Sequence, residues 1–135
     1  MTKRHQRRKS DVRDKLIDSI VSSRPESSIL DGRKQINLYL REYFRNVPYD
    51  DLANRSPKLM ARAALDHLAL ARKKGEGESL VRIFNPTIAE HGYESAYTIV
   101  EMANDNMPFL VDSVSAAISR QNLNIHITVH PIVRV

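Results

Sequence analysis

The chain of 135 residues contains no cysteine. This absence excludes disulfide bonds, metal sites built from thiolates and a cysteine nucleophile. No apolar run approaches the ~20 residues that a membrane-spanning helix needs. The basic N-terminus also lacks the apolar stretch of a secretory signal peptide. We therefore expect a cytoplasmic protein that makes no use of a membrane.

Acidic residues are absent from the first nine positions, which hold five of the 21 lysines and arginines. The other 16 basic residues balance the 16 acidic ones, so the net charge of +5 belongs to this terminus. We expect a disordered basic tail over residues 1–9, because it has little to bury. The alternative function is a small nucleic-acid-binding module that uses this arm. The sequence disfavours nucleic acid as a partner, since no aromatic residue is interleaved for base stacking.

The sequence also lacks the common motifs of catalysis and cofactor binding. There is no dinucleotide fingerprint, and the glycines of Gly75-Glu76-Gly77-Glu78 do not form a phosphate loop. Glu101 and Asp105 are expected on a strand and on the following turn, with nothing to show that they converge. His126 and His130 would lie on one strand face, about 13 Å apart, which is too far to share a metal. We expect no catalytic, metal-binding or cofactor-binding residue in this chain.

Helical patterns fill residues 10–75. The first predicted helix starts at Ser10 or Asp11 and ends at Arg24. The second starts at Ser28 or Asp31, and its dependable part follows Arg33, because Gly32 weakens its beginning. Ser56-Pro57 is a strong start for another helix, with a hydroxyl at the N-cap and proline at the first helical position. The glycines at 75 and 77 then predict a hinge.

Residues 80–135 read as strands and one helix. Residues 80–84 and 97–103 are β-rich, and residues 125–135 alternate between apolar and polar side chains. Pro131 places that last strand at a sheet edge. The helix between the last two strands has one apolar stripe, made of Leu110, Val114, Ala117 and Ile118, so we expect it to pack on one side of the sheet. The predicted fold class is α+β: an N-terminal helical segment followed by a partial ferredoxin-like βαβ unit with a right-handed crossover.

The segments VRIFNP (81–86), TIVEMANDNMPFLVDSV and IHITVHP resemble the N-terminal region of the large bacterial NAD-specific glutamate dehydrogenases. The resemblance covers roughly residues 35–135, a region similar to ACT domains, which sense amino acids. It implies a partial ACT-like domain at 80–135 that continues beyond the chain end. It also implies a regulatory or assembly role, while NAD and glutamate are handled by a catalytic domain not present here. Other domains or subunits of the enzyme, an amino-acid effector and a homo-oligomer are the implied partners.

The turn between the central strand and the helix is the candidate ligand site. It comprises Asn104, Asp105, Asn106, Met107 and Pro108. A helix N-terminus favours a carboxylate or another anion, and Asp105 could meet an amino group. The alternative is that these residues only cap the helix. Phe109 favours that alternative, because a ligand-binding ACT turn usually has glycine there.

Overall fold

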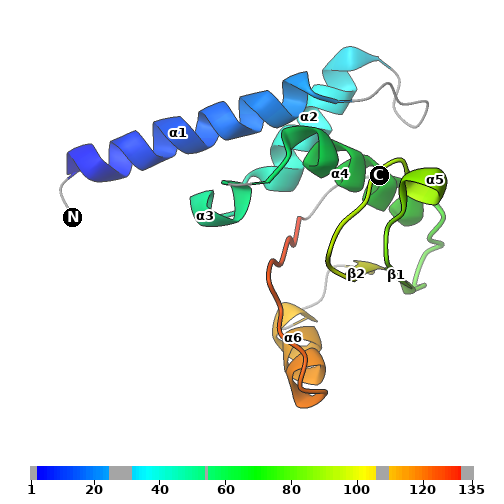
Figure 1. Cartoon of the computed structure of the whole chain (residues 1–135). Coiled ribbons are helices and arrows are strands. Elements are labelled where there is room, and N and C mark those ends of the chain that lie inside the picture. The colour runs from blue at the N-terminus through cyan, green and yellow to red at the C-terminus, as the bar shows by residue number, and fades with distance from the viewer. Residues whose placement is uncertain (1–2, 25–31, 54, 106–109, 132–135) are drawn as a thin grey trace.

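The computed structural model describes residues 3–24, 32–53, 55–105 and 110–131, with side chains from residue 11 onward. Helices occupy most of the first half, and a small sheet follows (Figure 1). The elements in chain order are α1 (Lys3–Ser22), α2 (Arg33–Phe44), α3 (Tyr49–Leu52), α4 (Pro57–Arg72), β1 (Leu80–Phe84), α5 (Ile88–His91), β2 (Ile99–Ala103) and α6 (Leu110–Arg120).

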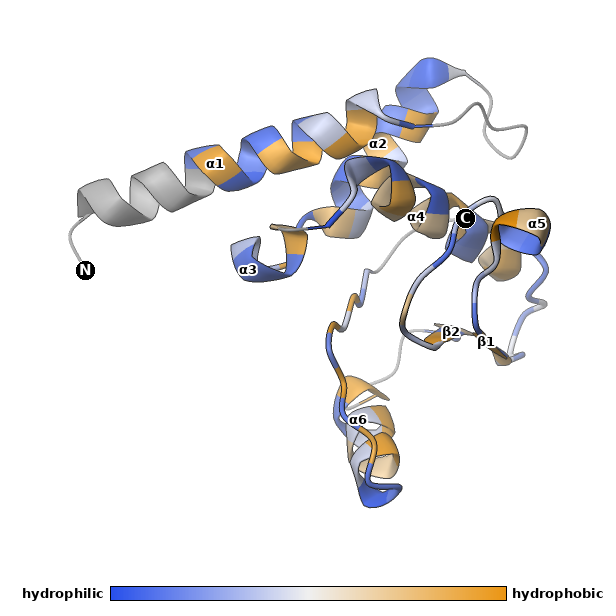
Figure 2. Ribbon diagram, in the orientation of Figure 1, coloured by the Kyte–Doolittle hydropathy of each residue, from blue (hydrophilic) through white to orange (hydrophobic). Residues whose placement is uncertain are grey.

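The first four helices share one apolar core. α1 packs against α2, α3 and α4, and α2 also contacts α4 (Figure 1). Polar and apolar residues alternate along the ribbon of α1, as expected for a helix with one buried face (Figure 2). The core side chains are Ile17, Ile20, Val21, Ile36, Leu40, Phe44, Val47, Leu52, Met60, Ala61, Ala64 and Leu65.

Local signals set the helix starts in this cluster. α2 begins at Arg33, directly after Gly32, whose φ of 86° suits glycine. α4 begins at Pro57, and the Ser56 hydroxyl accepts a hydrogen bond from the Leu59 amide at 3.4 Å. Both starts agree with the sequence prediction. α1 differs, because it begins at Lys3 rather than at Ser10 or Asp11. Residues 3–9 of the basic stretch that we expected to be disordered are helical here, as lysine, arginine and glutamine are good helix formers.

The sheet is an antiparallel pair of β1 and β2, in which Arg82 lies opposite Glu101. β2 packs against α4. Glu101 and Ala103 of β2 are buried, whereas Val81 and Ile83 of β1 are exposed. One face of the sheet is therefore directed toward α4, and the other face is apolar and exposed to solvent.

The last third differs from the predicted βαβ unit, although the α+β class is confirmed. Residues 125–131 form no strand, so no crossover is completed within the described residues; residues 132–135 lie outside them. A strand needs a neighbouring edge for its hydrogen bonds, and this segment instead runs back to the helical cluster, where Val129 packs against the core (Figure 1). The strand predicted for residues 125–135 is therefore wrong over residues 125–131.

α6 does not cover the sheet as we expected. It projects away from both the hairpin and the helical cluster (Figure 1), and none of its residues is fully buried. Leu110, Val114 and Ile118 of its predicted stripe are half-buried, and Ala117 is exposed. Periodicity identified the apolar side of this helix, but the contact that would bury it is not made. Among the described residues, no helix is long and apolar enough to cross a membrane.

Candidate functional site

The candidate ligand turn is only partly described. Asn104 and Asp105 follow β2 directly. Asn106, Met107 and Pro108 lie outside the described residues, and so does Phe109. The choice between a ligand site and a simple helix cap therefore stays open at these positions. What the structure does show is the surroundings of Asp105.

Asp105 is paired with a lysine from the end of the helical segment. Lys74 Nζ donates to Asp105 Oδ1 at 2.5 Å and to the Gly75 carbonyl at 3.0 Å. The hydrogen bond and the positive charge of Lys74 hold the pKa of the Asp105 carboxyl below its usual range, with a smaller effect from the Gly77 backbone. The Lys74 side chain is 13% exposed and that of Asp105 is 60% exposed. The pair is an ammonium and a carboxylate at the protein surface.

This pair ties the turn to the glycine hinge. The Gly75 amide donates to Glu78 Oε2 at 2.9 Å, which closes a tight turn. Gly77 follows with a φ of 73°, a backbone conformation that favours glycine. The predicted hinge and the predicted ligand turn are thus neighbours in space, joined by Lys74. The sequence offered no signal for this, because the two segments lie far apart along the chain.

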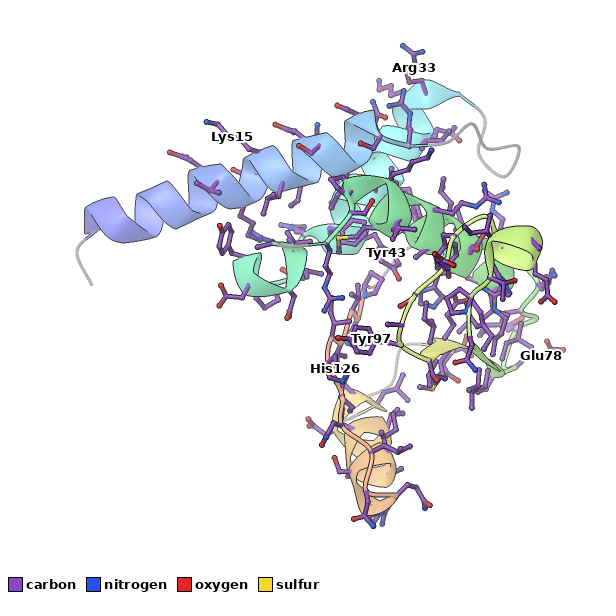
Figure 3. The ribbon with its side chains drawn as sticks, viewed as in Figure 1. Lys15, Arg33, Tyr43, Glu78, Tyr97 and His126 are labelled. Atoms are coloured by element: carbon purple, nitrogen blue, oxygen red, sulfur yellow. The ribbon has the colours of Figure 1, made fainter. Side chains whose placement is uncertain are left out.

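A polar junction between the helices and the sheet was also missed. His67 of α4 lies at its centre, with Nε2 2.9 Å from the Met102 carbonyl and Nδ1 2.9 Å from the Tyr43 hydroxyl. A carbonyl can only accept, so Nε2 carries the hydrogen and Nδ1 accepts from Tyr43. One imidazole therefore connects α2, α4 and β2. Figure 3 shows Tyr43 beside the helices that form this junction.

The buried face of the hairpin carries an ion pair. Arg82 Nη2 lies 2.7 Å from Glu101 Oε2, and the Glu101 side chain is only 6% exposed. The guanidinium also lies 4.3 Å from the centre of the Phe84 ring. Nearby, burial raises the pKa of Asp66 and raises the pKa of Tyr93 to about 12, where acidic neighbours add to the effect. An arginine among the apolar residues of β1 was the signal that an acid faces it across the sheet.

The other candidate groupings are not assembled. Glu101 pairs with Arg82 and Asp105 pairs with Lys74, so the two carboxylates serve separate contacts. The rings of His126 and Tyr97 lie side by side, with their centres 4.4 Å apart (Figure 3). The part of the chain that the structure describes contains no group of three or more histidine, aspartate or glutamate residues placed to hold a metal.

Comparison with known proteins identifies relatives for most of the chain. The family model for the glutamate dehydrogenase ACT1 domain matches residues 39–135. The NAD-specific glutamate dehydrogenase of Pseudomonas aeruginosa is 30% identical over 92 residues, which is 68% of this chain and 6% of that protein. The enzyme of the same name from Halomonas elongata is 29% identical over 96 residues, or 71% of this chain and 6% of that protein. No solved structure matches the chain.

Proposed function

Because the chain belongs to the family of glutamate dehydrogenase ACT1 domains, we propose that it is a non-catalytic regulatory and assembly region of a large NAD-dependent glutamate dehydrogenase. The match over residues 39–135 carries this proposal. The chain spans about 6% of the length of the curated relatives. The NAD-dependent conversion of glutamate to 2-oxoglutarate would then be performed by a catalytic domain outside this chain.

The partners that we propose are other domains or subunits of the same cytoplasmic enzyme, which would be a homo-oligomer at full length. Two apolar surfaces support this role. The outer face of the hairpin exposes Val81 and Ile83 by 60% and 66%, respectively. On α6, no residue is fully buried, and apolar side chains remain partly exposed along the helix (Figure 2). Surfaces of this kind are typical of sites where proteins or domains meet.

The regulatory part of the proposal rests on the turn that follows β2. We propose an amino acid as the effector, with residues 104–108 as its position. Lys74 and Asp105 give this position an ammonium and a carboxylate within 2.5 Å of each other. An amino acid carries the same two charges in a complementary arrangement, so it could exchange partners with the pair. Its carboxylate would meet Lys74 and its amino group would meet Asp105.

The role of the whole region can be tested in a full-length relative such as the Pseudomonas aeruginosa enzyme. The segment corresponding to residues 39–135 would be deleted, and glutamate-dependent reduction of NAD, its response to added amino acids and the oligomeric state would be measured. We expect retained chemistry with a lost amino-acid response or an altered assembly. A deletion that changes neither regulation nor assembly would contradict the proposal.

The effector position is tested separately on this chain by Asp105→Ala, with Asp112→Ala as the matched control. Asp112 is an exposed carboxylate in the first turn of α6. Melting temperature would be measured with and without millimolar amino acids. We expect an amino-acid-dependent rise in the parent and in Asp112→Ala, and no such rise in Asp105→Ala. If the parent shows no rise, the turn has only a structural role, and the assembly role is unaffected.

A further inference from the structure

The second edge of β2 is the feature that the proposed function leaves unexplained. β1 pairs with one edge of β2, and these two strands form the whole sheet within the described residues. An unpaired edge presents a row of backbone N–H and C=O groups that can pair with a strand from another molecule. Soluble proteins commonly block such edges with a side chain, a charge or a covering element.

α4 supplies a covering element here. It packs against β2, and His67 Nε2 donates to the Met102 carbonyl at 2.9 Å. A backbone carbonyl in a strand points toward one of the two neighbouring edges. Because His67 Nε2 occupies this carbonyl, we infer that it points to the edge of β2 that β1 does not occupy. The Tyr43 hydroxyl donates to the other ring nitrogen, Nδ1, at 2.9 Å.

We propose that His67 is an edge-blocking residue, which prevents β2 from pairing with β2 of a second copy of this chain. Pairing of two such edges would need the Met102 carbonyl as an acceptor, and His67 occupies it. The need for a block is clear from the neighbouring side chains. Val81, Ile83 and Val100 leave the outer face of the hairpin apolar and at least 42% exposed, so an added strand would bury apolar surface as well as satisfy its backbone.

His67→Leu removes the donor and opens the edge, whereas His67→Gln keeps an amide donor near the position of Nε2. Tyr43→Phe is the matched control, because it removes a hydrogen bond from the same imidazole and leaves the Met102 contact in place. Sedimentation velocity across a wide range of protein concentrations would report association, and circular dichroism would report folding. We expect His67→Leu to shift to larger species with rising concentration, and the other two variants to behave like the parent.

A second substitution shows which edge is used. Val100 lies two residues before Met102, so its N–H points to the same edge. Proline is tolerated at an edge N–H that makes no ladder bond. We expect His67→Leu/Val100→Pro to return to the association state of the parent. Continued association of this double variant, or a folded His67→Leu chain that sediments like the parent, would overturn the proposal.

A measurement on the parent covers the case in which His67→Leu does not fold. The proposal requires the Nε2–H tautomer, with Nδ1 as an acceptor. The nitrogen chemical shifts of the His67 ring distinguish the two tautomers. We expect the Nε2–H form, and the Nδ1–H form would overturn the proposal, because it has no hydrogen to donate to Met102.

Discussion

Three tyrosines at the helix–sheet junction differ in what their hydroxyls contact. Tyr39 donates to the Ala64 carbonyl at 2.5 Å, and Tyr43 donates to His67. The buried Tyr93 hydroxyl has no hydrogen-bond partner in the part of the chain that the structure describes. A buried polar group without a partner costs free energy, whereas a satisfied one contributes modestly to stability. The three phenols should therefore respond differently to loss of the hydroxyl.

Tyr43→Phe should lower the free energy of unfolding by about 1 kcal/mol, because it removes one hydrogen bond and leaves His67 Nδ1 without a donor. Tyr93→Phe should leave the free energy of unfolding unchanged or raise it, since no bond is lost. Urea denaturation of the two variants and the parent would compare them. A larger loss in Tyr93→Phe than in Tyr43→Phe would show that the Tyr93 hydroxyl has a partner after all.

Alkaline pH should destabilise the protein through one of these tyrosines, Tyr93. Burial raises the pKa of Tyr93 from 10.0 to about 12, so the folded state holds its proton more tightly than the unfolded state. The stability from this group is fully present below pH 10 and is lost as the pH rises toward 12. Tyr93→Phe removes this contribution. We expect its unfolding free energy to fall less steeply with pH than that of the parent, as measured by urea denaturation across this range.

At the scale of elements, the sequence predicted what is decided locally. The α2 and α4 starts follow from Gly32 and from the Ser56-Pro57 pair. β1 and β2 follow from short β-branched runs, and their pairing makes the sheet. The lack of a strand at 125–131 and the position of α6 away from the sheet (Figure 1) could not be predicted in this way. Both depend on which surface elsewhere in the molecule is available for packing or strand pairing, and the residues of the segment itself do not contain that information.

The Ser56 cap gives a test at this scale. Ser56→Ala removes the acceptor for the Leu59 amide, and loss of such a cap costs ~1 kcal/mol. Ser56→Asp should retain most of the stability, because aspartate is an equally good cap and its charge suits a helix N-terminus. Thermal unfolding would measure both variants. Equal losses in the two would mean that the hydroxyl does not cap α4.

The candidate site shows the same division between local and distant information. The sequence located a polar turn after the central strand, and the structure places Asn104 and Asp105 there. It did not show that Lys74 pairs with Asp105, because the pair depends on how the end of α4 docks beside β2. The contacts of His67 were missed for the same reason, because both of its partners come from other elements. The pairing of Glu101 with Arg82 had only an indirect signal, the arginine among the apolar residues of β1.

At the scale of the molecule, the chain divides into surfaces of different character. The helical cluster has an apolar core, and the helix–sheet junction is built from polar side chains. The outer hairpin face exposes apolar side chains instead, and the apolar stripe of α6 is only half-buried. Within this chain, stability should therefore come mainly from the core of the helical cluster. The outer hairpin face and α6 should matter mainly in a larger assembly.

Ile118→Ala and Leu40→Ala separate these contributions. Leu40 is fully buried in the core, and truncation there should cost 2–5 kcal/mol. Ile118 lies on the half-buried stripe of α6, which has no fully buried residue. Its truncation in this chain should lower the free energy of unfolding by less than ~1 kcal/mol. The Ile118 side chain buries little apolar surface here, and alanine favours helix. Chemical denaturation of the two variants measures the difference.

The corresponding substitutions in a full-length glutamate dehydrogenase should lose this contrast. If other domains or subunits cover α6, as the assembly role requires, removing the Ile118 side chain leaves a cavity in that interface, which destabilises it by more than the same change does in this chain. Thermal unfolding and the oligomeric state of the full-length variant would be compared with those of its parent. An Ile118→Ala change that is as mild in the full-length enzyme as in the short chain would show that the α6 stripe stays uncovered, and the assembly role would then have to rest on the hairpin face alone.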